Sequence, residues 1–160
     1  MVPRRDEAPH GVVPPPLAYA AALVVTAIVH VFAPTRVLPA GSLQFGVGLP
    51  VIALGLAMFA WAFTALRRVG EHPDPGRPTE AITTTGPYAV TRNPIYVAFT
   101  VVAVGVSLAV NSAWMIAGVP VALATVWWGT VRREERYLES KFGTTYLAYK
   151  RSVPRWFLFI

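Results

Sequence analysis

Long apolar segments alternate with short polar stretches along the chain. Four of them are long and apolar enough to cross about 30 Å of hydrocarbon as helices. They lie at about residues 17–33, 45–66, 95–110 and 113–131. The pattern predicts an all-α integral membrane protein with four transmembrane helices.

The third and fourth segments are separated only by Asn111 and Ser112. So short a connection predicts an antiparallel helical hairpin, with Ser112 as the N-cap of the second helix. Small residues such as Gly46 and Gly48 recur in the second segment and are expected to let helices approach closely.

The polar segments at the two ends give the domain organisation. Residues 1–16 are polar and rich in proline, which predicts a flexible cytoplasmic arm before a single membrane-embedded domain over residues 17–160. After the fourth segment, charges alternate in sign over residues 132–142, so the helix is expected to continue out of the membrane. Gly143 is a natural terminator for it.

Beyond Gly143, a last short helix is expected, with Thr144 as its cap and Pro154 after its end. The tail over residues 156–160 is apolar and is expected to lie on the membrane surface. The charged helix, the short helix and the tail predict short cytoplasmic C-terminal helices at the membrane face.

Composition supports the membrane prediction: 54% of residues are hydrophobic and only 14% are charged. Cysteine is absent, which excludes disulfides, zinc thiolate sites and a cysteine nucleophile, and no metal site is expected. The formal charge of +6 is a feature of nucleic-acid-binding proteins too, so the positions of the basic residues decide its meaning.

The basic residues are distributed very unevenly about the four segments. With a cytoplasmic N-terminus, Arg36 alone lies outside. The residues on the inner side are Arg4, Arg5, Arg67, Arg68, Arg77, Arg92, Arg132, Arg133, Arg136, Lys141, Lys150, Arg151 and Arg155. This positive-inside pattern predicts cytoplasmic N- and C-termini, and it accounts for the charge without nucleic acid. The expected location is the plasma membrane of a bacterium or archaeon.

The candidate reactive centre is the polar stretch GPYAVTRNPIY at residues 86–96, which lies between apolar segments. Gly86 and Pro87 predict a turn. Asn93 and Pro94 predict a helix start, with Asn93 as the capping side chain and Pro94 at the first helical position. The preceding loop, residues 70–85, is long, polar and rich in proline, and a functional role is favoured for it.

Residues 63–156 resemble the isoprenylcysteine carboxyl methyltransferase family of integral membrane methyltransferases, which is similar in turn to the phospholipid methyltransferases. The resemblance rests on Thr84-Thr85-Gly86-Pro87-Tyr88, Arg92-Asn93-Pro94-Ile95-Tyr96, Arg133-Glu134-Glu135-Arg136-Tyr137-Leu138, and Phe142-Gly143 with Tyr146 and Tyr149. Two positions depart from the isoprenylcysteine enzymes, since Asn93 stands where they have histidine and Thr130 where they have arginine.

The resemblance implies S-adenosylmethionine as the cofactor, bound between the loop, the start of the third helix and the charged helix. The implied contacts are Ile82, Thr83, Tyr88, Asn93, Pro94, Tyr96 and Glu134. No catalytic residue is assigned, and Arg92 and Arg133 are the candidates.

The chemistry agrees with this interpretation independently. A sulfonium methyl donor is a cation, so its site needs a carboxylate and aromatic faces, which Glu134, Tyr88 and Tyr96 supply. The Gly-rich strand-to-helix turn of soluble nucleotide-binding folds is absent from the sequence.

Several residues have simpler interpretations. In the simpler interpretation, Glu135, and less readily Glu134, pairs with neighbouring arginines on a solvated helix. Arg92 then only satisfies the positive-inside rule or binds lipid phosphate. Tyr137, Tyr146 and Tyr149 are more typical of packing positions.

The sequence therefore predicts an S-adenosylmethionine-dependent membrane methyltransferase with a lipophilic or membrane-delivered acceptor, such as a prenylated or lipid substrate, in contact with membrane lipids. Within enzymes, a phospholipid amine or small-thiol methyltransferase remains open. A non-catalytic membrane scaffold or small transporter, which belongs to another functional class, also remains open. The oligomeric state is left open.

Overall fold

A computed structural model describes residues 13–39, 41–71 and 77–156 of the chain. The regular elements of these residues are all helical. The long helices are α1 (Pro15–Phe32), α2 (Leu43–Arg68), α3 (Pro94–Val110) and α4 (Ala113–Val126). The shorter ones are the 3-10 turn η1 (Gly86–Ala89), the π-helical turn η2 (Trp127–Val131), α5 (Arg132–Phe142) and α6 (Thr144–Ser152).

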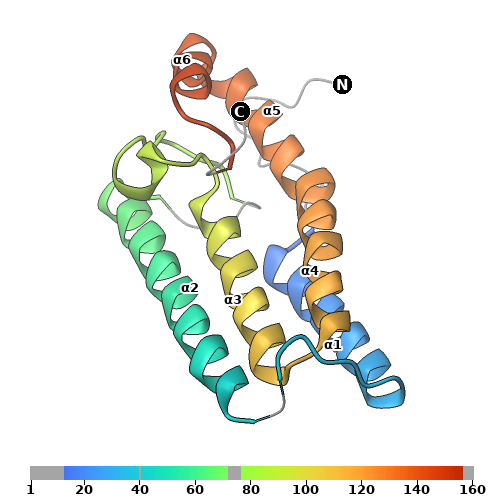
Figure 1. Cartoon of the computed structure of the whole chain (residues 1–160). Helices are drawn as coiled ribbons and strands as arrows, with labels where there is room; N and C mark the ends of the chain where they lie inside the picture. The colour runs from blue at the N-terminus through green and yellow to red at the C-terminus, as the bar shows by residue number, and fades with distance from the viewer. Residues whose placement is uncertain (1–12, 40, 72–76, 157–160) are drawn as a thin grey trace.

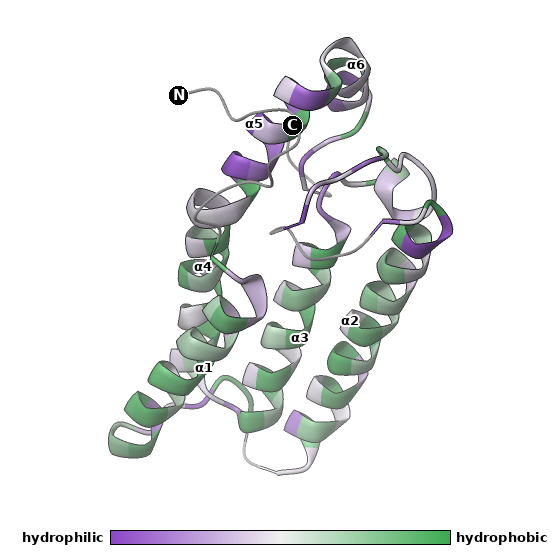
Figure 2. Cartoon of the chain, turned by 180° about the vertical axis from the view of Figure 1, so that it is seen from behind, coloured by the Kyte–Doolittle hydropathy of each residue, from purple (hydrophilic) through white to green (hydrophobic). Residues whose placement is uncertain are grey.

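The four long helices lie side by side along their length, and α5, α6 and the segment leading into α3 gather at one end (Figure 1). α2 packs mainly on α3, and α1 packs mainly on α4. Apolar residues lie along the four long helices, and most polar residues lie at the end that contains α5 and α6 (Figure 2). The molecule is thus an apolar bundle with a polar cap.

Three helical runs among the described residues are long and apolar enough to cross a membrane: α1, α2 and the continuous run from Ala113 to Phe142. Large apolar side chains on α1 and α2 are exposed, as expected for surfaces that face lipid. α3 is apolar but has only 17 residues, which gives a length of about 25 Å. The chain is therefore a membrane protein, and α3 is shorter than the other candidate spans.

The turn between α3 and α4 is built from polar side chains. Ser112 Oγ accepts a hydrogen bond from Met115 N at 3.2 Å, so the predicted cap of α4 is confirmed. Asn111 adopts a left-handed backbone conformation, and its side-chain oxygen accepts hydrogen bonds from Val37 N and Leu38 N. Asn111 therefore joins this turn to the segment that connects α1 and α2.

Glycines bring α2 and α3 into close contact. A Cβ atom added at Gly48 would lie 2.6 Å from Ala109 N, and one added at Gly105 would lie 2.6 Å from Ile52 N. Gly55 makes a similar approach to Val102. The expected close approach is confirmed for Gly48 and wrong for Gly46, whose added Cβ would meet nothing within 4 Å.

The helix that begins at Ala113 continues into α5, as predicted, but through the π-helical turn η2. This turn receives the segment before α1. Thr130 Oγ1 donates a hydrogen bond to Val13 O at 2.6 Å, and a Cβ at Gly129 would lie 2.7 Å from Val13 Cγ2. α1 begins at Pro15, two residues before the expected boundary, so the last two residues of the arm predicted for residues 1–16 are helical. Residues 1–12 of that arm lie outside the described residues.

Two predicted caps at the polar end are wrong. Asn93 immediately precedes α3, and Pro94 is its first residue as predicted, but the Asn93 side chain accepts no hydrogen bond from the helix. Its Nδ2 instead donates to Arg155 O at 3.2 Å, so a tertiary contact has replaced the local one. Gly143 ends α5 as predicted, with a φ of 54°, and it also precedes α6 directly, so Thr144 is already helical. The tail prediction is outside the described residues from 157 onward.

Candidate active site

A pocket lies at the polar end of the bundle, where α2, the loop after it, the start of α3, α5 and α6 meet. It is lined by Leu66, Glu71, Thr79, Ala81, Ile82, Thr83, Tyr88, Arg92, Asn93, Pro94, Ile95, Tyr96, Glu134, Leu138 and Tyr146. The lining therefore comes from segments that are up to 80 residues apart in the chain.

The start of α3 is held in place by the C-terminal segment. Arg92 N donates to Pro154 O at 3.0 Å, and Thr91 Oγ1 donates to Arg155 O at 2.7 Å. The Asn93 amide reaches the same Arg155 oxygen. Three consecutive residues are thus fixed against residues 154–155, which orients Arg92 and Asn93 in the pocket wall.

The loop over the pocket is anchored at both sides. Glu71, which is buried at the end of α2, accepts hydrogen bonds through Oε1 from Glu80 N at 2.7 Å and Ala81 N at 2.6 Å. Thr79 N donates to the hydroxyl of Tyr137 on α5 at 3.2 Å. A carboxylate that accepts backbone N–H groups forms strong, charge-assisted hydrogen bonds, so Glu71 fixes the loop that carries Ile82 and Thr83.

Glu134 faces the pocket from α5, beyond the apolar segment that ends at Val131. Its Oε2 accepts a hydrogen bond from the Tyr96 hydroxyl at 2.7 Å. Burial raises the pKa of the Glu134 carboxyl above its ordinary value; the Tyr96 hydrogen bond acts against this rise, and the charge of Glu135 adds to it. A carboxyl group in this state ionises most readily when a cation binds beside it.

The aromatic lining is fixed by hydrogen bonds as well. Tyr149 OH donates to the backbone oxygen of Tyr88 at 2.7 Å, which holds the turn that carries Tyr88. Burial raises the pKa of Tyr88, and the charges of Glu134 and Tyr149 raise it further, so its hydroxyl stays neutral. Tyr137 and Tyr149 thus support the wall, while Tyr146 also lines the pocket.

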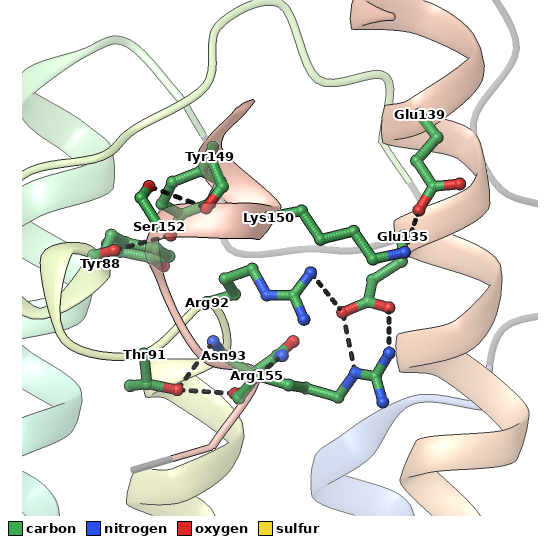
Figure 3. Close-up of polar contacts among 10 residues, drawn as sticks. All are labelled: Tyr88, Thr91, Arg92, Asn93, Glu135, Glu139, Tyr149, Lys150, Ser152 and Arg155. Atoms are coloured by element: carbon green, nitrogen blue, oxygen red, sulfur yellow. Dashed lines mark hydrogen bonds and ion pairs between the residues drawn. The ribbon is translucent and has the colours of Figure 1, made fainter. Parts of the chain in front are cut away.

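Glu135 has quite different surroundings from Glu134. It accepts hydrogen bonds from Arg155 Nε at 3.0 Å and Arg155 Nη2 at 2.8 Å, and Arg92 Nη1 lies 3.3 Å from its Oε1 (Figure 3). Hydrogen bonding to Glu135 raises the pKa of Arg155. The pairing interpretation therefore applies to Glu135, whose partners come from before α3 and from the C-terminal segment.

The structure brings together all seven residues implied as cofactor contacts, namely Ile82, Thr83, Tyr88, Asn93, Pro94, Tyr96 and Glu134. Of the two catalytic candidates, Arg92 lines the same pocket, whereas Arg133 is exposed on α5 and does not line it. A binding role for each residue remains a prediction.

Sequence reasoning missed several lining residues, among them Glu71, Thr79 and Leu138. Glu71 is detectable in part from the sequence, since it is the first acidic residue after Glu7 and follows Arg68, the basic end of α2, by three positions. No sequence signal indicates the role of residues 154–155, because this role uses backbone oxygen atoms, which every residue has.

Residues 43–145 match the family model for phospholipid methyltransferases. The chain belongs to this family. The matched region runs from the start of α2 to the second residue of α6, and it includes every pocket-lining residue except Tyr146. No curated protein and no solved structure matches the chain.

Phospholipid methyltransferases are membrane methyltransferases, and the family generally uses S-adenosylmethionine. The pocket residues fit this group. Glu134 offers a half-buried carboxylate for a cation, and Tyr88 and Tyr96 offer aromatic rings. Thr83 Oγ1 is buried and has no hydrogen-bond partner among the described residues, so it is available to a polar nucleoside.

Proposed function

We propose that this phospholipid methyltransferase family member is an integral membrane enzyme. In this proposal it transfers a methyl group from S-adenosylmethionine to a lipophilic or membrane-delivered acceptor, as isoprenylcysteine carboxyl methyltransferases do. The observation that carries the proposal is the pocket itself, which gathers Glu134, Tyr88 and Tyr96 at the polar end of an apolar bundle.

The cofactor would lie between the loop and α5. Ile82 and Thr83 would contact it from the loop, Tyr88, Asn93, Pro94 and Tyr96 from the entry to α3, and Glu134 from α5. A buried carboxylate paired with a cation forms a charge-assisted interaction that is stronger than one in water, which favours the sulfonium form over the neutral product.

The cofactor supplies an activated methyl group, which the acceptor's lone pair attacks in line while the carbon–sulfur bond breaks and its electron pair stays on sulfur. The protein's contribution is to align the acceptor and exclude water. Alignment alone is worth several kcal/mol of barrier, roughly 7–11 in the best intramolecular cases, so the proposal requires no dedicated acid or base.

We further propose that α3 spans the membrane, for four spans in total, with α3 and α4 as a hairpin and both termini cytoplasmic. This arrangement puts the pocket at the inner membrane face, where a lipid acceptor reaches it from the bilayer. Basic residues concentrated at that end support the orientation.

A phospholipid amine is the second candidate acceptor, and the family match favours it. The positions where the chain departs from the isoprenylcysteine enzymes agree with this alternative. Asn93 is bonded to Arg155 O, and Thr130, in place of arginine, is bonded to Val13 O.

Calorimetric titration of the purified protein in detergent with S-adenosylmethionine tests the proposal. Saturable one-site binding is expected, whereas a scaffold or transporter would give no saturable heat. A labelled methyl donor supplied with membrane lipid extract would then identify the acceptor as the extractable product that gains the label.

A further inference from the structure

Arg92 presents a buried positive charge to the pocket. Its side chain is only 6% exposed, yet it lines the pocket wall. Neither Nε nor Nη1 makes a hydrogen bond with a described residue, although Nη1 lies 3.3 Å from Glu135 Oε1. A guanidinium stays protonated and carries five N–H donors, so leaving buried donors unused is costly.

The unused donors follow from how Glu135 is shared. Arg155 takes both of its carboxylate oxygens through two hydrogen bonds and also stacks over the Trp127 ring at 5.0 Å. Arg92 is left with a longer contact to an already occupied oxygen (Figure 3). Two guanidinium groups thus share one carboxylate, which leaves the cluster with an excess positive charge on the pocket side.

The pocket wall also contains two carboxylates, Glu71 and Glu134. Glu71 Oε1 already accepts hydrogen bonds from Glu80 N and Ala81 N, so Glu134 is the carboxylate available to a ligand. Glu134 is on the same helix as Glu135, but it accepts a hydrogen bond from Tyr96 instead of pairing with an arginine. The pocket therefore presents a carboxylate, Glu134, and a guanidinium, Arg92. Protein partners use only part of the hydrogen-bonding capacity of each group. Such a pair is complementary to a ligand that carries both charges.

We infer that Arg92 binds an oxyanion in the pocket through its free guanidinium donors while Glu134 holds the cationic end, so the site recognises a zwitterion. This inference rests on the proposed function. Two sources supply the oxyanion: the carboxylate on the amino-acid part of the cofactor, and the phosphate of a lipid headgroup. Both match the planar fork of arginine, which binds such groups through two parallel hydrogen bonds.

The test uses calorimetry with S-adenosylmethionine, its decarboxylated analogue and a short-chain phosphatidylethanolamine, each titrated into wild type and Arg92→Gln. If the oxyanion is the cofactor carboxylate, Arg92→Gln weakens S-adenosylmethionine binding by about ten- to a hundredfold. Wild type then binds the decarboxylated analogue weakly, and Arg92→Gln weakens that binding no further. If the oxyanion is a headgroup phosphate, the loss appears with phosphatidylethanolamine and both cofactor forms are unaffected.

Arg155→Gln is the matched control, because it also removes an arginine from Glu135 but does not alter the pocket wall. It is expected to change binding of each ligand by less than about threefold. An equal loss from Arg155→Gln would overturn the inference, since the effect would then come from unpairing Glu135. The inference would also be overturned if the wild type bound both cofactor forms equally and bound no phosphatidylethanolamine. This measurement uses the wild type alone, so it does not depend on whether a variant folds.

The two proposals fail separately. If wild type binds no cofactor but binds phosphatidylethanolamine through Arg92, the methyltransferase proposal is wrong and the oxyanion site stands. If wild type binds the cofactor and Arg92→Gln matters for none of the three ligands, the oxyanion site is wrong and the methyltransferase proposal stands.

Discussion

Glu134 and Glu135 are adjacent in the chain but face different surroundings, because successive side chains on a helix point about 100° apart. Glu134 faces the pocket with Tyr96, and Glu135 faces Arg155 and Arg92. We predict that Glu134→Gln weakens cofactor binding by about ten- to a hundredfold, the value of a charge-assisted hydrogen bond of about 1.5–3 kcal/mol. Titration calorimetry in detergent measures it.

Glu135→Gln serves as the neighbouring control. It should change cofactor affinity several-fold at most but lower stability by about 3 kcal/mol, because two arginines lose a buried counter-charge. An equal or larger loss of affinity at Glu135 would mean that the cofactor lies on the other side of α5.

The raised pKa of Glu134 predicts a pH dependence. In the empty pocket, the carboxyl takes up a proton at a higher pH than an exposed glutamate does, whereas a bound cation favours the ionised form. Cofactor affinity should therefore fall as the pH drops through that raised pKa, and binding should release protons. Titrations from neutral to mildly acidic pH, in buffers of different ionisation enthalpy, measure both quantities.

Glu134→Gln should remove this dependence while leaving binding weak at every pH. An affinity for the wild type that is constant or rises on acidification would show that Glu134 does not carry the cation's counter-charge.

Single residues also show where sequence reasoning reaches its limit. The resemblance correctly predicted that seven residues lie in one pocket, because the motifs that carry them are local and follow a fixed order along the chain. The capping role of Asn93 was wrong because the side chain has a tertiary partner, Arg155 O, 62 residues away. Glu71 was missed because its partners are backbone N–H groups of a loop whose path the sequence does not specify.

At the scale of helices, the contact between α2 and α3 depends on glycine. A Cβ at Gly105 would lie 2.6 Å from Ile52 N and 3.0 Å from Gly48 O, both backbone atoms that cannot rotate away. Gly105→Ala is therefore predicted to destabilise the fold by about 1–3 kcal/mol through overpacking. Unfolding of the purified protein in detergent, followed by circular dichroism, measures this change.

Gly46→Ala gives the matched control on α2, since its Cβ would meet nothing within 4 Å. Both substitutions gain helix propensity, so the difference between them isolates the clash. Equal stability of the two variants would show that α2 and α3 pack less closely than described.

The helices themselves followed from the sequence more closely than their connections did. Pro94, Ser112 and Gly143 predicted the start of α3, the start of α4 and the end of α5 to within a residue, because proline, capping and glycine effects act locally. The π-helical turn η2 was missed, since it accompanies the tertiary contact between Thr130 and Val13, which no local pattern encodes.

At the scale of the whole molecule, the two ends of the apolar bundle differ, because only one of them carries the polar cap. The polar cap contains α5 and α6, and the opposite end contains the turn between α3 and α4 and the start of α2 (Figures 1 and 2). The pocket lies at the capped end, since residues of α5 and α6 line it. If the positive-inside rule holds, the pocket opens on the cytoplasmic side, where a soluble cofactor is made and a lipid acceptor is held in the adjoining leaflet. The orientation therefore determines which compartment supplies the cofactor.

Single cysteines test this orientation cleanly, because the chain has none of its own. Ser42 and Thr145 are both exposed, and they lie at opposite ends of the bundle. Neither side chain caps a helix: Ser42 precedes α2 without a capping hydrogen bond, and Thr145 is the second residue of α6. Substitution at either position should therefore leave the fold intact, unlike Ser112, which is buried and caps α4.

We predict that Ser42→Cys reacts in intact cells with a membrane-impermeant maleimide, while Thr145→Cys reacts only after the cells are broken open. The expected contrast follows from having Arg36 alone on the outer side and all other basic residues on the inner side. The reverse pattern would invert the topology and put the pocket outside the cell, away from the cofactor supply. Labelling of both variants in intact cells would mean that the two ends of the bundle are on one side, and the spanning arrangement itself would then be wrong.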